Sequence, residues 1–207
     1  MILELYHAPT SPYVRKVMIC AHELGLADEI EILASAANPI VRDARIATFN
    51  PLAKVPAARL ADGTVLYDSR VICEYLDHVG QGGLFPRNSG RWEVLTQQAL
   101  GDGLLDAALL VRYEDTARPE GLRLEAWRAG QMTKIAAALD AMEASHARFA
   151  DSFTIGGITF ACALGYLDFR FPALDWRAGR PHITGWFAQM SQRDSVQRTV
   201  PKDAPRP

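Results

Sequence analysis

The sequence predicts a small α/β domain with the element order βαβαββα, followed by an all-helical domain. Short strand patterns alternate with helical patterns as far as residue 78. A glycine-rich run at 80–83 then interrupts the chain, and no convincing strand follows it. We therefore expect two domains, residues 1–79 and 90–207, joined by a linker at about 80–89.

Two periodicities define the elements of the first domain. Alternating apolar and polar residues indicate strands, and Asp62-Gly63 between the last two strands is a strong hairpin signal. Apolar residues at helical spacing indicate helices. The expected strands are 2–6, 29–33, 56–60 and 64–67, and the expected helices are 12–25, 40–48 and 69–78.

Long helical patterns dominate the second domain. They cover 90–117, a stretch from Pro119 to about 148, then 159–170 and 182–191, and the tail 201–207 is expected to be irregular. The stretch 159–170 is apolar on all sides, which is typical of a central, buried helix.

Composition excludes several classes of protein. The 207 residues are 49% hydrophobic and 22% charged, as in an ordinary globular protein. The net charge of −2 provides no basic field for nucleic acid or for an anionic membrane. No apolar run is long enough to span a bilayer, and the first residues show no secretory pattern. We expect a cytoplasmic protein.

The cysteines predict neither a disulfide framework nor a zinc site. Cys20, Cys73 and Cys162 are far apart, odd in number and without metal-ligand spacing. Each lies in an apolar helical pattern, which favours a small buried side chain.

A possible anion site lies where the first helix begins. Ser11 precedes Pro12, and serine at the N-cap followed by proline at the first helical position is a favoured helix start. The hydroxyl group would then lie at the positive end of a helix, just after a strand. Capping alone would also explain this serine, so the segment by itself does not settle its role.

Four segments, in the same order along the chain, resemble glutathione transferases of the bacterial type. Any one of them would be a weak signal, but the order of all four makes the resemblance specific. They are Leu5-Tyr6 with Thr10–Lys16, Asn50–Pro56, Leu66–Ser69 with Ile72, Tyr75 and Leu76, and Ala163–Asp168. The resemblance covers nearly the whole chain and implies a thioredoxin-like first domain, a homodimer and a role in detoxification.

The resemblance also implies a glutathione site. It places a cis peptide at Val55-Pro56, where the backbone of Val55 would pair with the tripeptide. Asp68 would accept from the γ-glutamyl ammonium, while Ser69 and the adjoining helix N–H groups would hold its carboxylate. It further implies roles for Lys54 in orienting the ligand and for Asp102, or Asp106 one turn later, in reaching it across the dimer interface.

The chemistry implied is activation of the glutathione thiol. Ser11 would donate a hydrogen bond to the sulfur, while Tyr6 is the competing residue and His7 and Thr10 lie nearby. Thiolate attack on a small electrophile follows, with no metal. The electrophile pocket is expected near Arg112, Tyr113 and Trp176 of the helical domain.

Other functions remain open on the same fold. A glutathione-dependent isomerase, dehalogenase or peroxidase needs only bound glutathione, and a non-catalytic interaction domain could keep the fold alone. A disulfide reductase is disfavoured because Thr10-Ser11 stands where that class has cysteine. The family usually has aspartate three residues after the cap of the central helix; with Thr159 as the expected cap, Cys162 stands there instead.

Overall fold

The computed structural model describes residues 1–35 and 37–203, and contacts divide the chain into two compact units. The first unit contains Met1–Arg87 and the segment that begins at Asp194; the second is Asn88–Arg193. The boundary between residues 87 and 88 lies inside the expected linker. The return to the first unit at Asp194 differs from the sequence expectation, which assigned the chain after residue 90 to the helical domain.

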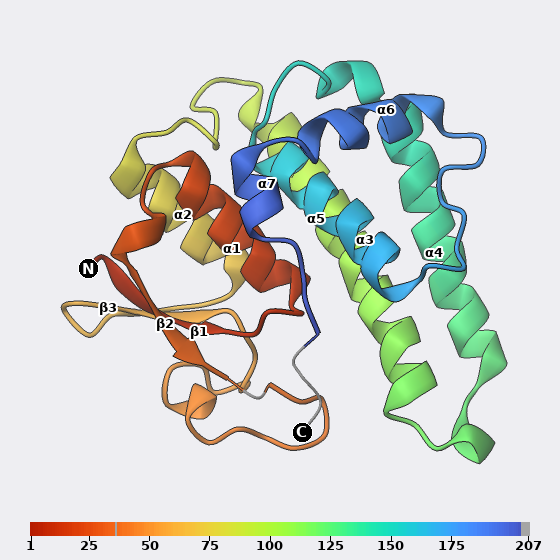
Figure 1. Ribbon diagram of the computed structural model, residues 1–207, viewed down its shortest axis with the longest axis horizontal. Helices are drawn as coiled ribbons and strands as arrows, with labels where there is room; N and C mark the ends of the chain where they lie inside the picture. Colours follow the sequence, from red (N-terminus) through yellow and green to blue (C-terminus); the bar gives the residue numbers. More distant parts are fainter. Residues whose placement is uncertain (36, 204–207) are drawn as a thin grey trace. The chain divides into compact units, whose positions relative to one another are not determined.

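The first unit is built on a four-stranded mixed sheet with the order β2-β1-β3-β4 (Figure 1). Strand β1 (Leu3–His7) pairs parallel with β2 (Ile30–Ala34) and antiparallel with β3 (Ala57–Leu60). Strand β4 (Val65–Leu66) pairs antiparallel with β3. The four strands expected from the sequence are confirmed, with no end shifted by more than one residue.

Two helices complete the core of this unit. Helix α1 (Pro12–Glu23) and helix α2 (Ser69–Gly80) pack against each other beside the sheet (Figure 1). Leu3 and Leu5 occupy alternate positions of β1 and are fully buried, as the pleat of a strand requires when one face is covered. A short 3-10 helix, η1 (Ala27–Glu29), precedes β2.

The prediction of a helix at 40–48 is wrong. Only one 3-10 turn, η2 (Ile46–Thr48), forms there. The side chain of Asn38 accepts from the N–H groups of Ile40 and Val41, and that of Asp43 accepts from the N–H of Arg45. These local side-chain bonds compete with helical backbone bonds and hold the segment as turns.

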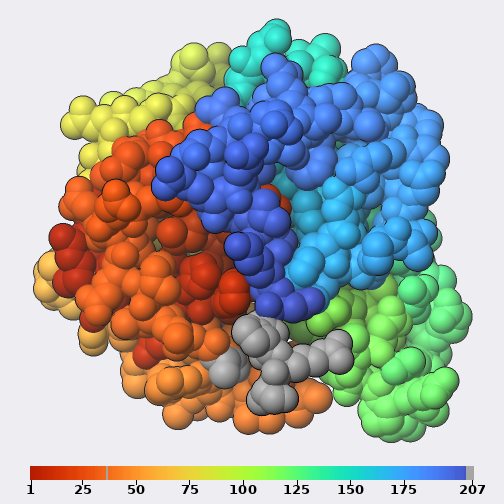
Figure 2. All heavy atoms as spheres, viewed as in Figure 1, coloured from red at the N-terminus to blue at the C-terminus, as the bar shows by residue number. Residues whose placement is uncertain are grey.

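A short C-terminal helix that the sequence did not indicate, α7 (Asp194–Arg198), explains why the chain returns to the first unit. Arg15 of α1 is buried and donates to the carbonyl of Val196 at 3.2 Å, and the Ser195 hydroxyl bonds Glu23. Figure 1 shows α7 next to α1, and in Figure 2 the dark blue atoms of this segment lie against the red and orange atoms of the first unit. A buried guanidinium needs acceptors, and α7 supplies them. Residues 201–203 have no regular structure, as expected, and 204–207 lie outside the described residues.

The second unit, residues 88–193, contains helices and no strand. Helix α3 packs against both α4 and α5, and every residue of α5 from Ile155 to Leu167 is buried, which confirms the expected central helix. The helices are α3 (Arg91–Thr116), α4 (Glu125–Ala144), α5 (Ile155–Arg170) and α6 (Pro181–Met190), with 3-10 turns η3 (Glu120–Leu122) and η4 (His146–Arg148).

Two expected helix starts are corrected. Pro119 does not begin α4; the Glu114 carboxylate accepts from the N–H of Leu124 at 2.6 Å, which keeps Leu124 extended, so α4 begins one residue later. Helix α5 begins at Ile155, with Thr154 as its N-cap. Thr159 is therefore inside the helix, where its hydroxyl donates to the carbonyl of Ile155 at 2.7 Å. Because the helix begins earlier than expected, Cys162 does not stand three residues after the cap.

Among the described residues, no helix has the length and the apolar character that crossing a membrane requires.

Candidate active site

Ser11 is the N-cap of α1. Its backbone is extended, with φ −80° and ψ 120°, and its side-chain oxygen accepts from the N–H of Val14 at 3.3 Å. Pro12 occupies the first helical position. The hydroxyl oxygen is thus occupied as an acceptor, which leaves the hydroxyl hydrogen available to donate to a ligand at the positive end of the helix.

The loop before β3 has backbone groups that are available to bind a ligand. The Val55-Pro56 peptide is cis, and Asn50, which is 2% exposed, donates to the carbonyl of Lys54 at 3.0 Å and accepts from the N–H of Leu52 at 3.0 Å. Within residues 1–35 and 37–203, neither the N–H nor the C=O of Val55 makes a hydrogen bond. Both groups can therefore pair with the backbone of an extended peptide.

The start of α2 offers a second helix end. Asp68 is the N-cap, and its Oδ1 accepts from the N–H of Arg70 at 2.9 Å. The Tyr67-Asp68 peptide is also cis. Asp68 is exposed and Ser69, the first residue of the helix, is buried. Asp68 thus caps α2 at the surface of the first unit.

The sheet register brings these three segments to one edge. Tyr6, near the end of β1, is opposite Ala57 at the start of β3, and Ala58 is opposite Leu66 at the end of β4. The end of β1, the start of β3 and the end of β4 therefore share one edge of the sheet. Close in sequence to these three strand ends lie Ser11, the pair Val55-Pro56 and the pair Asp68-Ser69.

Tyr6 points into a different environment. Its ring packs edge-on against Phe49 with 4.8 Å between ring centroids, and the guanidinium of Arg59 lies 4.6 Å from the centre of the Phe49 ring. Burial lowers the pKa of His7, whose carbonyl accepts from the Ser35 hydroxyl at 3.2 Å. Thr10 is half-buried beside Ser11.

The remaining expected ligand contacts differ in exposure. Lys54 is exposed. On α3, Asp102 is 1% exposed, whereas Asp106, one turn later, is exposed. Only Asp106 therefore presents its side chain on the surface of the single chain.

The helical unit contains a cleft of about 390 Å³ between the end of α3, the start of α4 and the turn after α5. Arg112, which the sequence analysis placed near the electrophile pocket, lines this cleft. Tyr113, the next residue on α3, does not line it. Trp176 is buried in the core, where its Nε1–H donates to Asp168 at 2.8 Å.

Sequence reasoning missed Arg128 and Arg170, which also line the cleft. The residues around each of them in the sequence do not distinguish it from other arginines. Because the two lie on different helices, no local pattern groups them. Among the described residues, no group of three or more His, Cys, Asp or Glu side chains is placed to hold a metal ion. The three cysteines are buried thiols, as expected.

Comparisons with known proteins agree with the fold. A family model of the glutathione S-transferase N-terminal domain matches residues 10–79, and one of the C-terminal domain matches residues 125–189. The chain is also 34% identical to the uncharacterized GST-like protein YibF of Escherichia coli strain K12, over 98% of this chain and 100% of that protein. The chain belongs to the glutathione S-transferase family.

Solved structures of the family extend the comparison. A glutathione transferase family member from Pseudomonas fluorescens Pf-5, solved with bound glutathione, is 48% identical with a TM-score of 0.95. The match covers 97% of this chain and 100% of that one. A structure of a family member from the same bacterium holds S-(propanoic acid)-glutathione; it is 47% identical with a TM-score of 0.90 over the same shares of the two chains. The glutathione transferase fold expected from the sequence is thus confirmed.

Proposed function

We propose that this family member is a glutathione S-transferase that binds glutathione in its first unit and activates the thiol for attack on a small electrophile. The observation that carries the proposal is the single sheet edge shared by the cap of α1, the free backbone of Val55 and the start of α2. The glutathione held by the Pseudomonas fluorescens relatives supports the choice of ligand.

In this proposal the tripeptide lies along that edge. The N–H and C=O of Val55 pair with the cysteinyl backbone of glutathione, beside the cis Pro56. The γ-glutamyl carboxylate binds at the start of α2 near Ser69, and the carboxylate of Asp68 accepts from the γ-glutamyl ammonium. Exposed Lys54 attracts the glycyl carboxylate.

Ser11 acts on the sulfur. Its hydroxyl oxygen accepts from Val14, so its hydrogen donates to the thiolate, and the positive end of α1 adds to the stabilisation. A hydrogen bond to a charged group contributes about 1.5–3 kcal/mol, which lowers the pKa of the bound thiol from about 8.5 to about 7. The thiol proton leaves to solvent, and the thiolate forms a carbon–sulfur bond while the leaving group departs.

Two finer assignments are part of the proposal. A homodimer, in which Asp106 or Asp102 contacts the glutathione of the partner subunit, follows from the family, and the exposure of Asp106 favours that residue. A cytoplasmic location and a role in detoxification likewise rest on the family alone.

The first test is a titration of glutathione followed by thiolate absorbance across pH. We expect saturable binding and a bound-thiol pKa near 7; Ser11→Ala should raise that pKa by about one unit or more and lower kcat/KM about tenfold to a hundredfold. Thr10→Val removes a neighbouring hydroxyl and should leave both quantities near wild type.

Three outcomes would change the assignment. If Tyr6→Phe rather than Ser11→Ala raises the pKa, the sulfur contact is Tyr6 and the transferase function stands. If glutathione binds as a thiolate but no electrophile is conjugated, an isomerase, a dehalogenase or a peroxidase becomes the better account. If millimolar glutathione does not bind, an interaction domain replaces the enzyme.

A further inference from the structure

The cleft of the helical unit has an unusual charge. It is lined by three arginines, one carboxylate and one threonine, with apolar side chains on the remaining wall. Its volume of about 390 Å³ falls in the range of sites for one small molecule. The lining residues are Arg112, Asp115, Thr116, Arg128, Met132, Arg170, Phe171, Pro172, Ala173 and Leu174.

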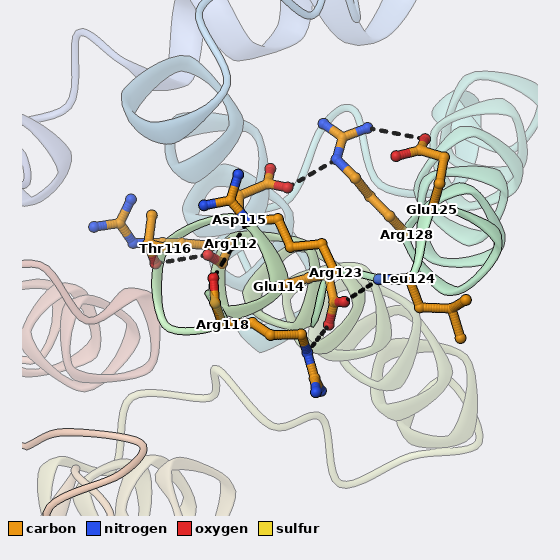
Figure 3. Close-up of polar contacts among 9 residues, drawn as sticks. All are labelled: Arg112, Glu114, Asp115, Thr116, Arg118, Arg123, Leu124, Glu125 and Arg128. Carbon is orange, nitrogen blue, oxygen red and sulfur yellow. Dashed lines mark hydrogen bonds and ion pairs between the residues drawn. The ribbon is translucent and has the colours of Figure 1, made fainter. Parts of the chain in front are cut away.

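The three guanidinium groups are not equivalent. Arg128 donates to Asp115 at 3.0 Å and lies 4.0 Å from Glu125, so its charge is offset (Figure 3). The guanidinium of Arg170 lies 3.8 Å from the centre of the Phe169 ring. For the guanidinium of Arg112, no ion pair or hydrogen bond occurs in the described part of the chain. Arg112 is therefore a cation in this cleft that has no carboxylate partner among the described residues.

Two tyrosines that interact with the charge of Arg112 do not neutralise it. Burial raises the pKa of Tyr113, and it raises that of Tyr166 to about 12, while the charge of Arg112 opposes both changes. Both phenols therefore stay neutral at physiological pH and supply no negative charge to Arg112. A ligand carboxylate would supply the negative charge that this group of side chains lacks.

The end of α3, which carries Arg112, is held in place. Glu114 of α3 accepts from the N–H of Leu124 at 2.6 Å and from Nε of Arg118 at 2.8 Å (Figure 3). The hydrogen bond from the Leu124 N–H makes the largest contribution to lowering the pKa of Glu114. The carboxylate of Glu114 is therefore ionised at neutral pH and keeps this bond. The end of α3 is thereby fixed to the start of α4, and the cleft between them is preformed.

We propose that this cleft binds an organic carboxylate, with Arg112 as the group that binds the carboxylate and Met132, Phe171 and Leu174 as the apolar contact for its carbon skeleton. The ligand class is an apolar, aromatic or short-chain carboxylic acid that carries an electrophilic carbon. The assignment of this ligand as a substrate rests on the proposed transferase function; the binding of the anion does not.

The kinetic test compares two electrophiles that differ in one charge, 4-chloro-3-nitrobenzoate and 4-chloro-3-nitrobenzamide. In both, the glutathione thiolate forms a bond to the ring carbon that carries chlorine, and chloride leaves with the bonding electron pair. After normalisation to the uncatalysed rates, we expect a higher kcat/KM for the benzoate. Arg112→Gln should lower the benzoate value about tenfold or more and change the benzamide value less than about twofold.

Two variants control for charge and for folding. Arg112→Lys keeps the positive charge and should recover part of the benzoate activity. Arg148→Gln removes an exposed arginine that pairs with Glu93 at 3.4 Å outside the cleft, and it should change neither substrate. Equal losses on both substrates in Arg112→Gln, or no loss on the benzoate, would overturn the proposal.

A binding measurement separates the two proposals. 4-Chloro-3-nitrobenzoate is titrated into the full chain without glutathione by calorimetry, at two salt concentrations. Binding that weakens with salt and is lost in Arg112→Gln supports the anion cleft even if no conjugation occurs, in which case only the transferase proposal fails. The proposed role of the cleft is wrong if the benzoate is conjugated but does not bind, or if Arg112→Gln leaves its binding unchanged. Either result leaves the transferase proposal standing.

Discussion

At the residue scale, Ser11 shows how one side chain serves structure and chemistry together. Its oxygen caps α1 by accepting from the N–H of Val14, and a hydroxyl group that accepts can still donate. The capping interpretation and the catalytic interpretation therefore do not compete. The substitution Ser11→Ala removes both, which is why the pKa of the bound thiol, rather than stability, is the informative readout.

Tyr166 gives a second prediction at this scale. Burial raises its pKa to about 12, and the charges of Arg112 and Arg170 only partly oppose this. Because the folded state holds the proton more tightly than the unfolded state, this contribution to the free energy of unfolding is fully present below pH 10. It is lost as pH rises from about 10 to about 12, and it amounts to roughly 3 kcal/mol.

The measurement is tyrosinate absorbance during an alkaline titration. We expect the transition at highest pH to vanish in Tyr166→Phe and to persist in Tyr67→Phe, which removes an exposed ring. An unchanged last transition in Tyr166→Phe would contradict the assignment of this pKa to the buried phenol.

At the element scale, the contact between α3 and α5 depends on a glycine. A Cβ atom at Gly101 would lie 2.8 Å from Cγ2 of Thr159 and 3.1 Å from Cδ1 of Phe160. Real side chains do not approach so closely, so the two helices would have to separate. Gly103, two residues later on the same helix, has nothing within 4 Å of its Cβ position.

The pair gives a matched prediction. Gly101→Ala should lower the free energy of unfolding by about 1–3 kcal/mol because it overpacks the contact. Gly103→Ala should raise it by up to about 1 kcal/mol, since alanine favours an exposed helical position over glycine. Urea unfolding of both variants tests this, and a Gly101→Ala variant as stable as wild type would show that the helices adjust without cost.

At the scale of the whole molecule, the chain returns to its first unit after building the second. Arg15 is buried and donates to the Val196 carbonyl at 3.2 Å and to the Thr199 hydroxyl at 3.5 Å. Helix α1 thus depends on residues 180 positions and more away in sequence, and the same helix carries Ser11 at its start. The C-terminal segment supports the helix on which the proposed thiol activation relies.

This dependence predicts a stability loss for a single buried donor. Arg15→Met keeps the apolar bulk but removes the hydrogen bonds, and we expect it to lower the free energy of unfolding by about 1–3 kcal/mol. Arg198→Met should cost less than about 0.5 kcal/mol, because Arg198 is 63% exposed and pairs with Asp194 only one turn away. Equal effects in thermal unfolding would contradict a special role for Arg15.

The sequence by itself determined the features that depend on short stretches of chain. Ser11-Pro12 predicts a capped helix start, and the Asp62-Gly63 hairpin predicts β3 and β4, because caps and turns are fixed by a few neighbouring residues.

Only the tertiary structure decided the features made by residues distant in sequence. The start of α4 depends on Glu114 capturing the N–H of Leu124, and the docking of α7 depends on Arg15. The cleft gathers Arg112, Arg128 and Arg170 from three helical regions, and Asp115 offsets the charge of one of them. No local pattern encodes such contacts, because their energies arise only when the helices pack together.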